Sequence, residues 1–190
     1  MAARAVAAGR TRADAVRNRE RVMAAAVEVL AEKGEDAVVP EIAARAGVGK
    51  GTVYRCFPTK DHLVAAVATE RVRWFEREAR AAAAAEDSWA AFATFIARYA
   101  EAHSRDRGMV FSMAQNLELP ELVEARAAAQ DAVRELMDRA KAQGTMRADA
   151  DPADLRILLS GVARSLVAEQ ERDPAVWRRC AQLVVDALRA

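Results

Sequence analysis

Residues 42–54 read IAARAGVGKGTVY, and the interpretation of the whole chain starts from this stretch. Ala43 is small enough to let two helices cross closely, and Gly47 supplies a turn position that can take a positive φ. The apolar residues that would pack into a small core and fix the crossing are Ile42, Ala46, Val48 and Val53. The stretch therefore predicts a helix-turn-helix.

A helix-turn-helix lays the start of its second helix against base edges in the major groove of DNA. In this sequence those positions are Gly49, Lys50, Gly51 and Thr52. Lys50 and Gly49 are the best candidates for base contact, and contact of Lys50 with phosphate alone stays open. Gly51 is a poor helix former, which fits a close approach of the backbone to DNA; a frayed helix end is the alternative.

The composition predicts an all-α fold around this motif. Alanine, the best helix former, accounts for 47 of the 190 residues, whereas there are only three isoleucines and 5 % aromatic residues. A β-sandwich or barrel is therefore excluded. Apolar spacing and capping residues predict helices at about 14–33, 40–47, 50–56, 59–85, from 87 onward, at 120–143, and after Asp151-Pro152 and Asp173-Pro174.

The continuation of the motif resembles the TetR family of transcriptional regulators. Residues 51–63, GTVYRCFPTKDHL, are similar to the recognition helix and the start of the fourth helix of that family. The resemblance is specific over residues 19–64 and architectural beyond them. It implies a three-helix DNA-binding head followed by a helical ligand-binding and dimerisation domain. We expect a disordered basic arm at 1–12, the head at 13–58 and the second domain at 59–190.

The resemblance also implies roles for single residues. Thr52, Tyr54 and Lys60 match family positions that hydrogen-bond DNA phosphates. Lys60 has independent support, because a lysine at a helix amino terminus opposes the helix dipole unless an anion lies there. Arg45 and Arg55 are interpreted as solvated surface charges, although either is long enough to reach the DNA backbone.

Two positions depart from the family pattern. Val38-Val39 stands where relatives carry a hydroxyl residue at the start of the second helix, so that cap and its phosphate contact are in doubt. Cys56 replaces a common histidine before Phe57. We interpret Cys56 as a small packed side chain; a thiol whose oxidation disturbs DNA binding is the alternative.

An aromatic cluster in the middle of the chain predicts an apolar pocket between helices. Seven of the ten aromatic residues lie between positions 74 and 111, and methionines and polar side chains accompany them. The alternative is that they only fill the core. The candidate ligand-binding residues are Trp74, Phe75, Trp89, Phe92, Phe95, Tyr99, His103, Met109, Phe111, Met113 and Asn116.

The last two predicted helices carry apolar residues on more than one face, which predicts a homodimer. A thicker monomeric core is the alternative. Together these features predict a cytoplasmic, homodimeric repressor that binds a palindromic operator in double-stranded DNA and is released by a small apolar or amphipathic effector. An activator or ligand-independent regulator of the same fold, and a DNA-binding protein without sequence specificity, are the alternatives.

Charge and composition argue against other classes. The net charge is only +1, lower than non-specific DNA-binding proteins usually carry, yet residues 1–60 hold 11 basic against 7 acidic groups. Two distant cysteines indicate reduced thiols, and no apolar run is long enough to span a membrane. The string at 47–52 lacks the glycine and hydroxyl positions of a phosphate loop, and only two histidines are present. No enzyme activity, cofactor or metal site is predicted.

Overall fold

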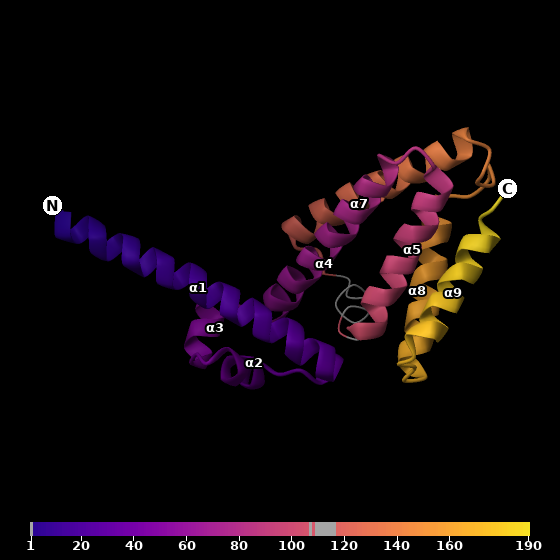
Figure 1. Ribbon diagram of the computed structural model, residues 1–190. Helices are drawn as coiled ribbons and strands as arrows, with labels where there is room; N and C mark the ends of the chain where they lie inside the picture. The colour runs from indigo at the N-terminus through magenta and orange to yellow at the C-terminus, as the bar shows by residue number, and fades with distance from the viewer. Residues whose placement is uncertain (1, 107, 109–116) are drawn as a thin grey trace.

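The structure, a computed structural model, describes residues 2–106, 108 and 117–190, and helices make up most of this part of the chain. The helices are α1 (Ala2–Lys33), α2 (Val39–Ala46), α3 (Lys50–Cys56), α4 (Lys60–Ala83), α5 (Ser88–Arg105), α7 (Pro120–Ala142), α8 (Pro152–Ala168) and α9 (Pro174–Ala187), with a 3-10 turn η1 (Gly34–Asp36) after α1 (Figure 1). The predicted all-α fold is confirmed. In the described ranges no helix is long and apolar enough to cross a membrane.

Side chains cap the helix starts at the positions that the sequence predicts. Each capping oxygen accepts a hydrogen bond from a backbone N–H of the first turn, which satisfies one of the donors left open at a helix start. The caps, with the residue whose amide donates, are Thr59 with His62, Asp87 with Ala90, Asp151 with Ala153 and Asp173 with Ala175. The starts of α4, α5, α8 and α9 are therefore fixed by capping side chains that the sequence itself supplies.

The amino-terminal part differs from the expectation. Residues 1–12 were expected to form a disordered arm, whereas α1 extends to Ala2. Five of the residues at 2–12 are alanine, so local helix propensity favours continuation of the helix. Helix α2 begins at Val39, and its N-cap Val38 makes no side-chain cap hydrogen bond, as the missing hydroxyl predicts.

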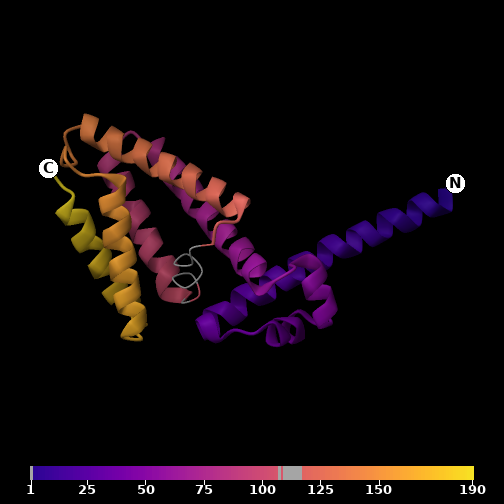
Figure 2. The ribbon, with the colours of Figure 1, turned by 180° about the vertical axis from the view of Figure 1, so that it is seen from behind.

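The head consists of α1, α2, α3 and the beginning of α4, and it lies at one end of the molecule (Figures 1 and 2). Helix α1 contacts α2, α3 and α4. The buried side chains of this head core come from all four helices and include Val22, Val29, Leu30, Ile42, Val53, Phe57, Leu63 and Val67. The predicted crossing residues Ile42, Ala46 and Val53 are buried in it.

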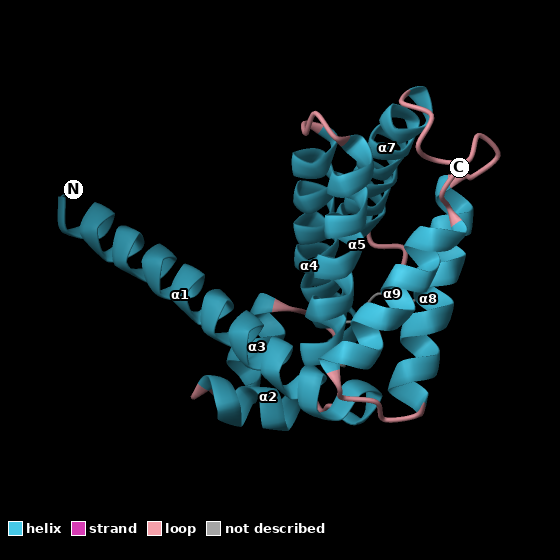
Figure 3. Ribbon diagram, turned by 45° about the vertical axis from the view of Figure 1, so that its right-hand side comes forward, coloured by secondary structure: helices cyan, strands magenta, loops and turns pink. Residues whose placement is uncertain are grey.

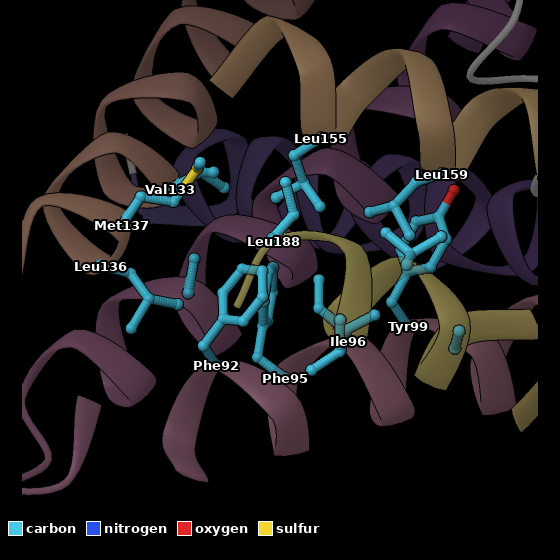
Figure 4. Close-up of a cluster of buried hydrophobic side chains, with 14 of the residues drawn as sticks. Phe92, Phe95, Ile96, Tyr99, Val133, Leu136, Met137, Leu155, Leu159 and Leu188 are labelled. Carbon is cyan, nitrogen blue, oxygen red and sulfur yellow. The ribbon is translucent and has the colours of Figure 1, made fainter. Parts of the chain in front are cut away.

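The second domain is a helical bundle in which α8 and α9 lie side by side beside α5 (Figure 3). Its largest cluster buries side chains of α5, α7, α8 and α9 together, among them Phe92, Phe95, Ile96, Leu136, Met137, Leu155 and Trp177 (Figure 4). A smaller cluster joins α4 to α7 through Ala65, Ala68, Val72, Leu122, Ala125 and Ala129. Helix α4 thus packs into both domains.

A buried arginine ties the end of α5 to α4. The Arg71 guanidinium, 8 % exposed, pairs with the Asp106 carboxylate and donates to the Gly108 carbonyl oxygen at 2.6 Å. Burial lowers the pKa of Arg71, and the Asp106 charge opposes that shift. Gly108 in turn lies against the backbone of α1, because a Cβ there would stand 2.5 Å from the Leu30 carbonyl carbon and oxygen. Only glycine fits this contact between the two domains.

Gly108→Ala is expected to destabilise the protein by about 1–3 kcal/mol, since the added methyl group meets backbone atoms that cannot move independently. Gly51→Ala is the matched control. Nothing lies within 4 Å of the Cβ position in this helical glycine, so the change is expected to stabilise the free protein by about 1 kcal/mol. Urea denaturation of both variants measures the effect. Equal stability of Gly108→Ala and the wild type would contradict the tight contact.

Candidate DNA-binding face and effector cavity

The turn between α2 and α3 has the geometry that the sequence predicts. Gly47 takes φ 63° and ψ 38°, in the left-handed region. The amides of Gly47 and Val48 donate to the carbonyl oxygens of Ala44 and Ala43, at 3.1 and 3.0 Å. Arg21 of α1 donates to the Gly47 carbonyl oxygen at 3.3 Å. These bonds close the end of α2 and hold the start of α3 at a fixed angle.

The start of α3 presents the predicted DNA-contacting residues on the surface. Gly49, Lys50 and Gly51 are exposed, and Tyr54 is 48 % exposed, which is unusual for a large aromatic side chain. Thr52 is half-buried. Val53 faces inward, where it is 1 % exposed. The short helix therefore has one face in the head core and the other in solvent.

Arg55 has a role that the interpretation as a solvated charge missed. Its guanidinium donates to the Gly51 carbonyl oxygen at 3.2 Å and to the Thr52 hydroxyl oxygen at 2.9 Å. Because the Thr52 oxygen accepts this bond, its O–H is left to donate, for example to a phosphate oxygen. Arg55 thus orients Thr52.

Arg45 and Lys60 both have protein partners. Arg45 pairs with Glu28 at 3.0 Å and Glu32 at 2.9 Å of α1, so it fastens α2 to α1, and these carboxylates raise its pKa. Lys60 donates to the Glu35 carbonyl oxygen at 2.9 Å. That bond holds the ammonium group at the start of α4 and links α4 to the turn after α1. Lys60 therefore has a structural role beside its predicted phosphate contact.

A cavity of about 600 Å³ lies in the second domain between α4, α5, α7 and α8. Three of the predicted ligand-binding residues line it: Phe75, Tyr99 and His103. Phe75 lies against the Tyr99 ring with centroids 5.7 Å apart, and Tyr99 against the His103 ring at 3.9 Å. The sequence therefore located part of the wall of this cavity.

Four of the predicted ligand-binding residues within the described ranges do not line it. Phe92 and Phe95 are buried in the main core, and Trp89 packs against that core, so for these three the core-filling alternative holds. Trp74 is half-buried outside the lining. Met109, Phe111, Met113 and Asn116 lie outside the described residues.

Sequence reasoning named none of the residues on α7 and α8 that line the cavity as ligand-binding residues. They are Arg126, Ala129, Gln130, Val133 and Arg134 on α7, and Pro152, Ala153, Leu155, Arg156, Leu159, Ser160, Ala163 and Arg164 on α8, with the N-cap Asp151. Polar residues recur there at every fourth position, but such spacing is common on solvated helix faces. Only the packing of the two helices places these rows at one cavity.

His103 is the buried polar group of the cavity wall. It is 1 % exposed, and its Nδ1 lies 2.9 Å from the Tyr99 carbonyl oxygen. Burial lowers the pKa of His103 to about 4, helped by the nearby Arg71 charge. The ring is therefore neutral at pH 7. Because a carbonyl oxygen only accepts, Nδ1 carries the proton and Nε2 is left as an acceptor.

Comparisons with known proteins identify the family. Residues 22–67 match the model of the bacterial regulatory proteins of the tetR family, and residues 87–190 match the C-terminal domain of SbtR-like transcriptional regulators. A search of the curated proteins found no match. The chain belongs to the TetR family of transcriptional regulators, whose members are regulators rather than enzymes.

Solved structures agree. The TetR regulatory protein from Mycobacterium vanbaalenii is 38 % identical, with a TM-score of 0.60 over 95 % of this chain and 99 % of that one. The TetR regulator SCO0520 from Streptomyces coelicolor is 31 % identical, with a TM-score of 0.63 over 90 % and 98 %. FadR from Bacillus subtilis, solved with stearoyl-CoA, shares the fold at 21 % identity, with a TM-score of 0.69 over 87 % and 97 %.

The low pKa of His103 predicts a pH dependence of stability. Above about pH 6.5 His103 is neutral in both the native and the unfolded chain. As the pH falls from 6.5 towards 4, the unfolded chain takes up a proton that the native ring refuses. Up to about 3 kcal/mol of stability is therefore lost in that window.

Replacement of His103 by Gln removes this contribution. The loss of stability between pH 7 and pH 4.5, measured by urea denaturation, is expected to be smaller in His103→Gln than in the wild type. His62→Gln, which changes an exposed histidine in the head, is the control for loss of an imidazole. An unchanged pH dependence in His103→Gln would show that His103 is not the group responsible.

Proposed function

We propose that this TetR-family regulator is a homodimeric repressor that binds a palindromic operator and releases it when a small apolar or amphipathic effector occupies the cavity. The observation that carries the proposal is that one helix, α4, serves both sites. Its first residue, Lys60, lies in the DNA-binding head, and Val72 and Phe75 line the cavity. The start of α3 supplies the DNA contacts, with Gly49, Lys50, Gly51, Thr52 and Tyr54 in the roles predicted above.

The geometry supports coupling between the cavity and the head. Lys60 and Val72 are 12 residues apart, about 18 Å along one rod, so a tilt at the cavity end moves the head end. A second connection runs through Arg71, next to Val72, to Gly108 and on to the backbone of α1 at Leu30. If two heads must meet major grooves about 34 Å apart, a change of a few ångström in their separation weakens both contacts together.

DNA titration tests the regulatory function directly. DNA from just upstream of the coding region and a shuffled fragment of the same length are titrated at two salt concentrations. We expect a preference of about a hundredfold or more for the first fragment, or for a site recovered by genome-wide selection. Equal affinity for every sequence with a steep salt dependence would instead indicate a non-specific DNA-binding protein.

Lys50→Ala is expected to weaken operator binding by about tenfold or more, because each head of a dimer loses a charged contact. Gly51→Ala is expected to weaken operator binding although it stabilises the free protein, since the added methyl group stands between backbone and DNA. Arg172→Ala, which removes an exposed charge in the turn between α8 and α9, is the control for net charge. Electrophoretic mobility shift or fluorescence anisotropy measures the affinities. Wild-type affinity in Lys50→Ala would remove this residue from the interface.

Exposed apolar side chains on α8 and α9 support the proposed dimer. Leu183 is 60 % exposed and Ile157 is 58 % exposed, and Leu158 beside it is 38 % exposed. Neighbouring residues Leu155, Leu159 and Val184 are buried in the domain's own core, so these helices have a second apolar face that is uncovered in one chain. Such a face is typical of an interface between subunits.

Leu183→Glu combined with Ile157→Glu is expected to convert the dimer to monomer, because the interface would bury two unpaired carboxylates per subunit. Size-exclusion chromatography with light scattering measures the mass. Val123→Glu is the control, as Val123 is 48 % exposed on α7, away from the proposed interface. A dimer that survives the double substitution would place the interface elsewhere.

A further inference from the structure

Four arginines at the edge of the cavity, called its rim below, indicate the charge of the ligand that the cavity would bind. On α7, Arg126, Gln130 and Arg134 follow one another at intervals of four residues, and all three line the cavity. Residues four apart in a helix lie on the same face, so these side chains form a row about 12 Å long. The row reads arginine, amide, arginine.

Helix α8 carries a matching row. Arg156, Ser160 and Arg164 have the same spacing of four and also line the cavity. This row reads arginine, hydroxyl, arginine. The two helices therefore bring four arginine side chains, with a neutral hydrogen-bonding side chain in the middle of each row, to one cavity.

The counter-charge at this rim is small. Asp151 is the only carboxylate among the described lining residues, and its oxygen already accepts the Ala153 amide as a helix cap. Arg134 is paired with Asp131 at 2.6 Å, and Arg126 donates to the Leu117 carbonyl oxygen at 3.3 Å. For Arg156 and Arg164, both exposed, no carboxylate within 4.0 Å is found in the described part of the chain.

The inner wall is mostly apolar by contrast, with the neutral His103 imidazole as its buried polar group. Besides His103, the buried side chains of the lining are Val72, Tyr99, Ala129, Val133, Leu155, Leu159 and Ala163 (Figure 4 labels four of them). Charged groups would be costly among buried side chains, whereas the exposed side chains of Arg134, Arg156 and Arg164 stay solvated until a ligand arrives. The cavity is thus apolar inside and cationic at its rim.

From this division we infer that the effector is an amphipathic anion, an apolar chain that ends in a carboxylate or phosphate group. The chain occupies the inner wall, and the anionic head is bound by guanidinium groups of the two rows, which suit carboxylate and phosphate oxygens. The Gln130 amide donates a further hydrogen bond to the head. This inference rests on the proposed effector function and specifies its ligand.

Four probes of equal chain length test the inference by isothermal titration calorimetry on the full-length protein: decanoate, decyl phosphate, 1-decanol and decylammonium. Both anions share the chain of the other two probes and differ in the head group. We expect at least one anion to bind about tenfold or more tightly than 1-decanol, and decylammonium to bind most weakly. The order of decanoate and decyl phosphate then identifies the preferred head.

The variant Arg156→Gln combined with Arg164→Gln separates charge from packing. It is expected to weaken binding of the preferred anion by about tenfold and to leave 1-decanol unchanged, since the apolar wall is intact. Arg172→Gln, outside the cavity, is the control. Circular dichroism checks that each variant is folded, and Arg164→Gln alone is the milder alternative if the pair is not.

Equal binding of 1-decanol and the anions, tighter binding of decylammonium, or no binding of any probe would overturn the inference. None of these outcomes touches the proposed regulatory function, because operator affinity is measured without a ligand. Conversely, if the protein binds the anions selectively but shows no preference for operator DNA, the inferred ligand class would stand and the proposed repressor function would be wrong.

Discussion

The architecture depends on the continuity of α4, because this one helix contributes to every hydrophobic cluster in the described part of the chain. Leu63 and Val67 belong to the head core, Val72 to the cluster shared with α7, and Ala79 to the core of the second domain. An α-helix transmits displacement along its axis because each peptide unit is hydrogen-bonded to the next turn. Both domains are therefore built on a single rod.

The Arg71 cluster adds a second link to this rod. A buried guanidinium must be paired, and here the pairing partners come from the end of α5 and from Gly108. Removal of either Arg71 or Asp106 would leave the other charge buried without a counter-charge, and the folded state would lose stability. Since Gly108 lies against the backbone of α1, the second domain is joined to the head at two points, along α4 and at the end of α1. Two connections fix the orientation of the head relative to the second domain more firmly than one would.

The start of α3 and the cavity differ in the kind of partner that their surfaces suit. The start of α3 exposes short and flexible residues around Lys50, which suits close approach to a regular DNA groove. The cavity encloses apolar walls under a cationic rim, which suits a single small ligand with two chemically different ends. The buried His103 ring in the cavity wall stays neutral, so its Nε2 offers a hydrogen-bond acceptor to a ligand without adding to the charge of the arginine side chains. Charge is thus kept at the surface in both sites.

Apart from the start of α1, the sequence by itself determined the helix boundaries and the helix-turn-helix, because these depend on neighbouring residues: Gly47 at the turn, Asp87 and Asp151 as caps, and apolar spacing within each helix. It also located Phe75, Tyr99 and His103 at the cavity. Only the tertiary structure decided that Phe92 and Phe95 fill the core, since their spacing is the same in either role. The pairing of the arginine rows on α7 and α8, and the fit of Gly108 against Leu30, likewise join residues far apart in the chain. Such contacts depend on how helices pack, which local propensity does not encode.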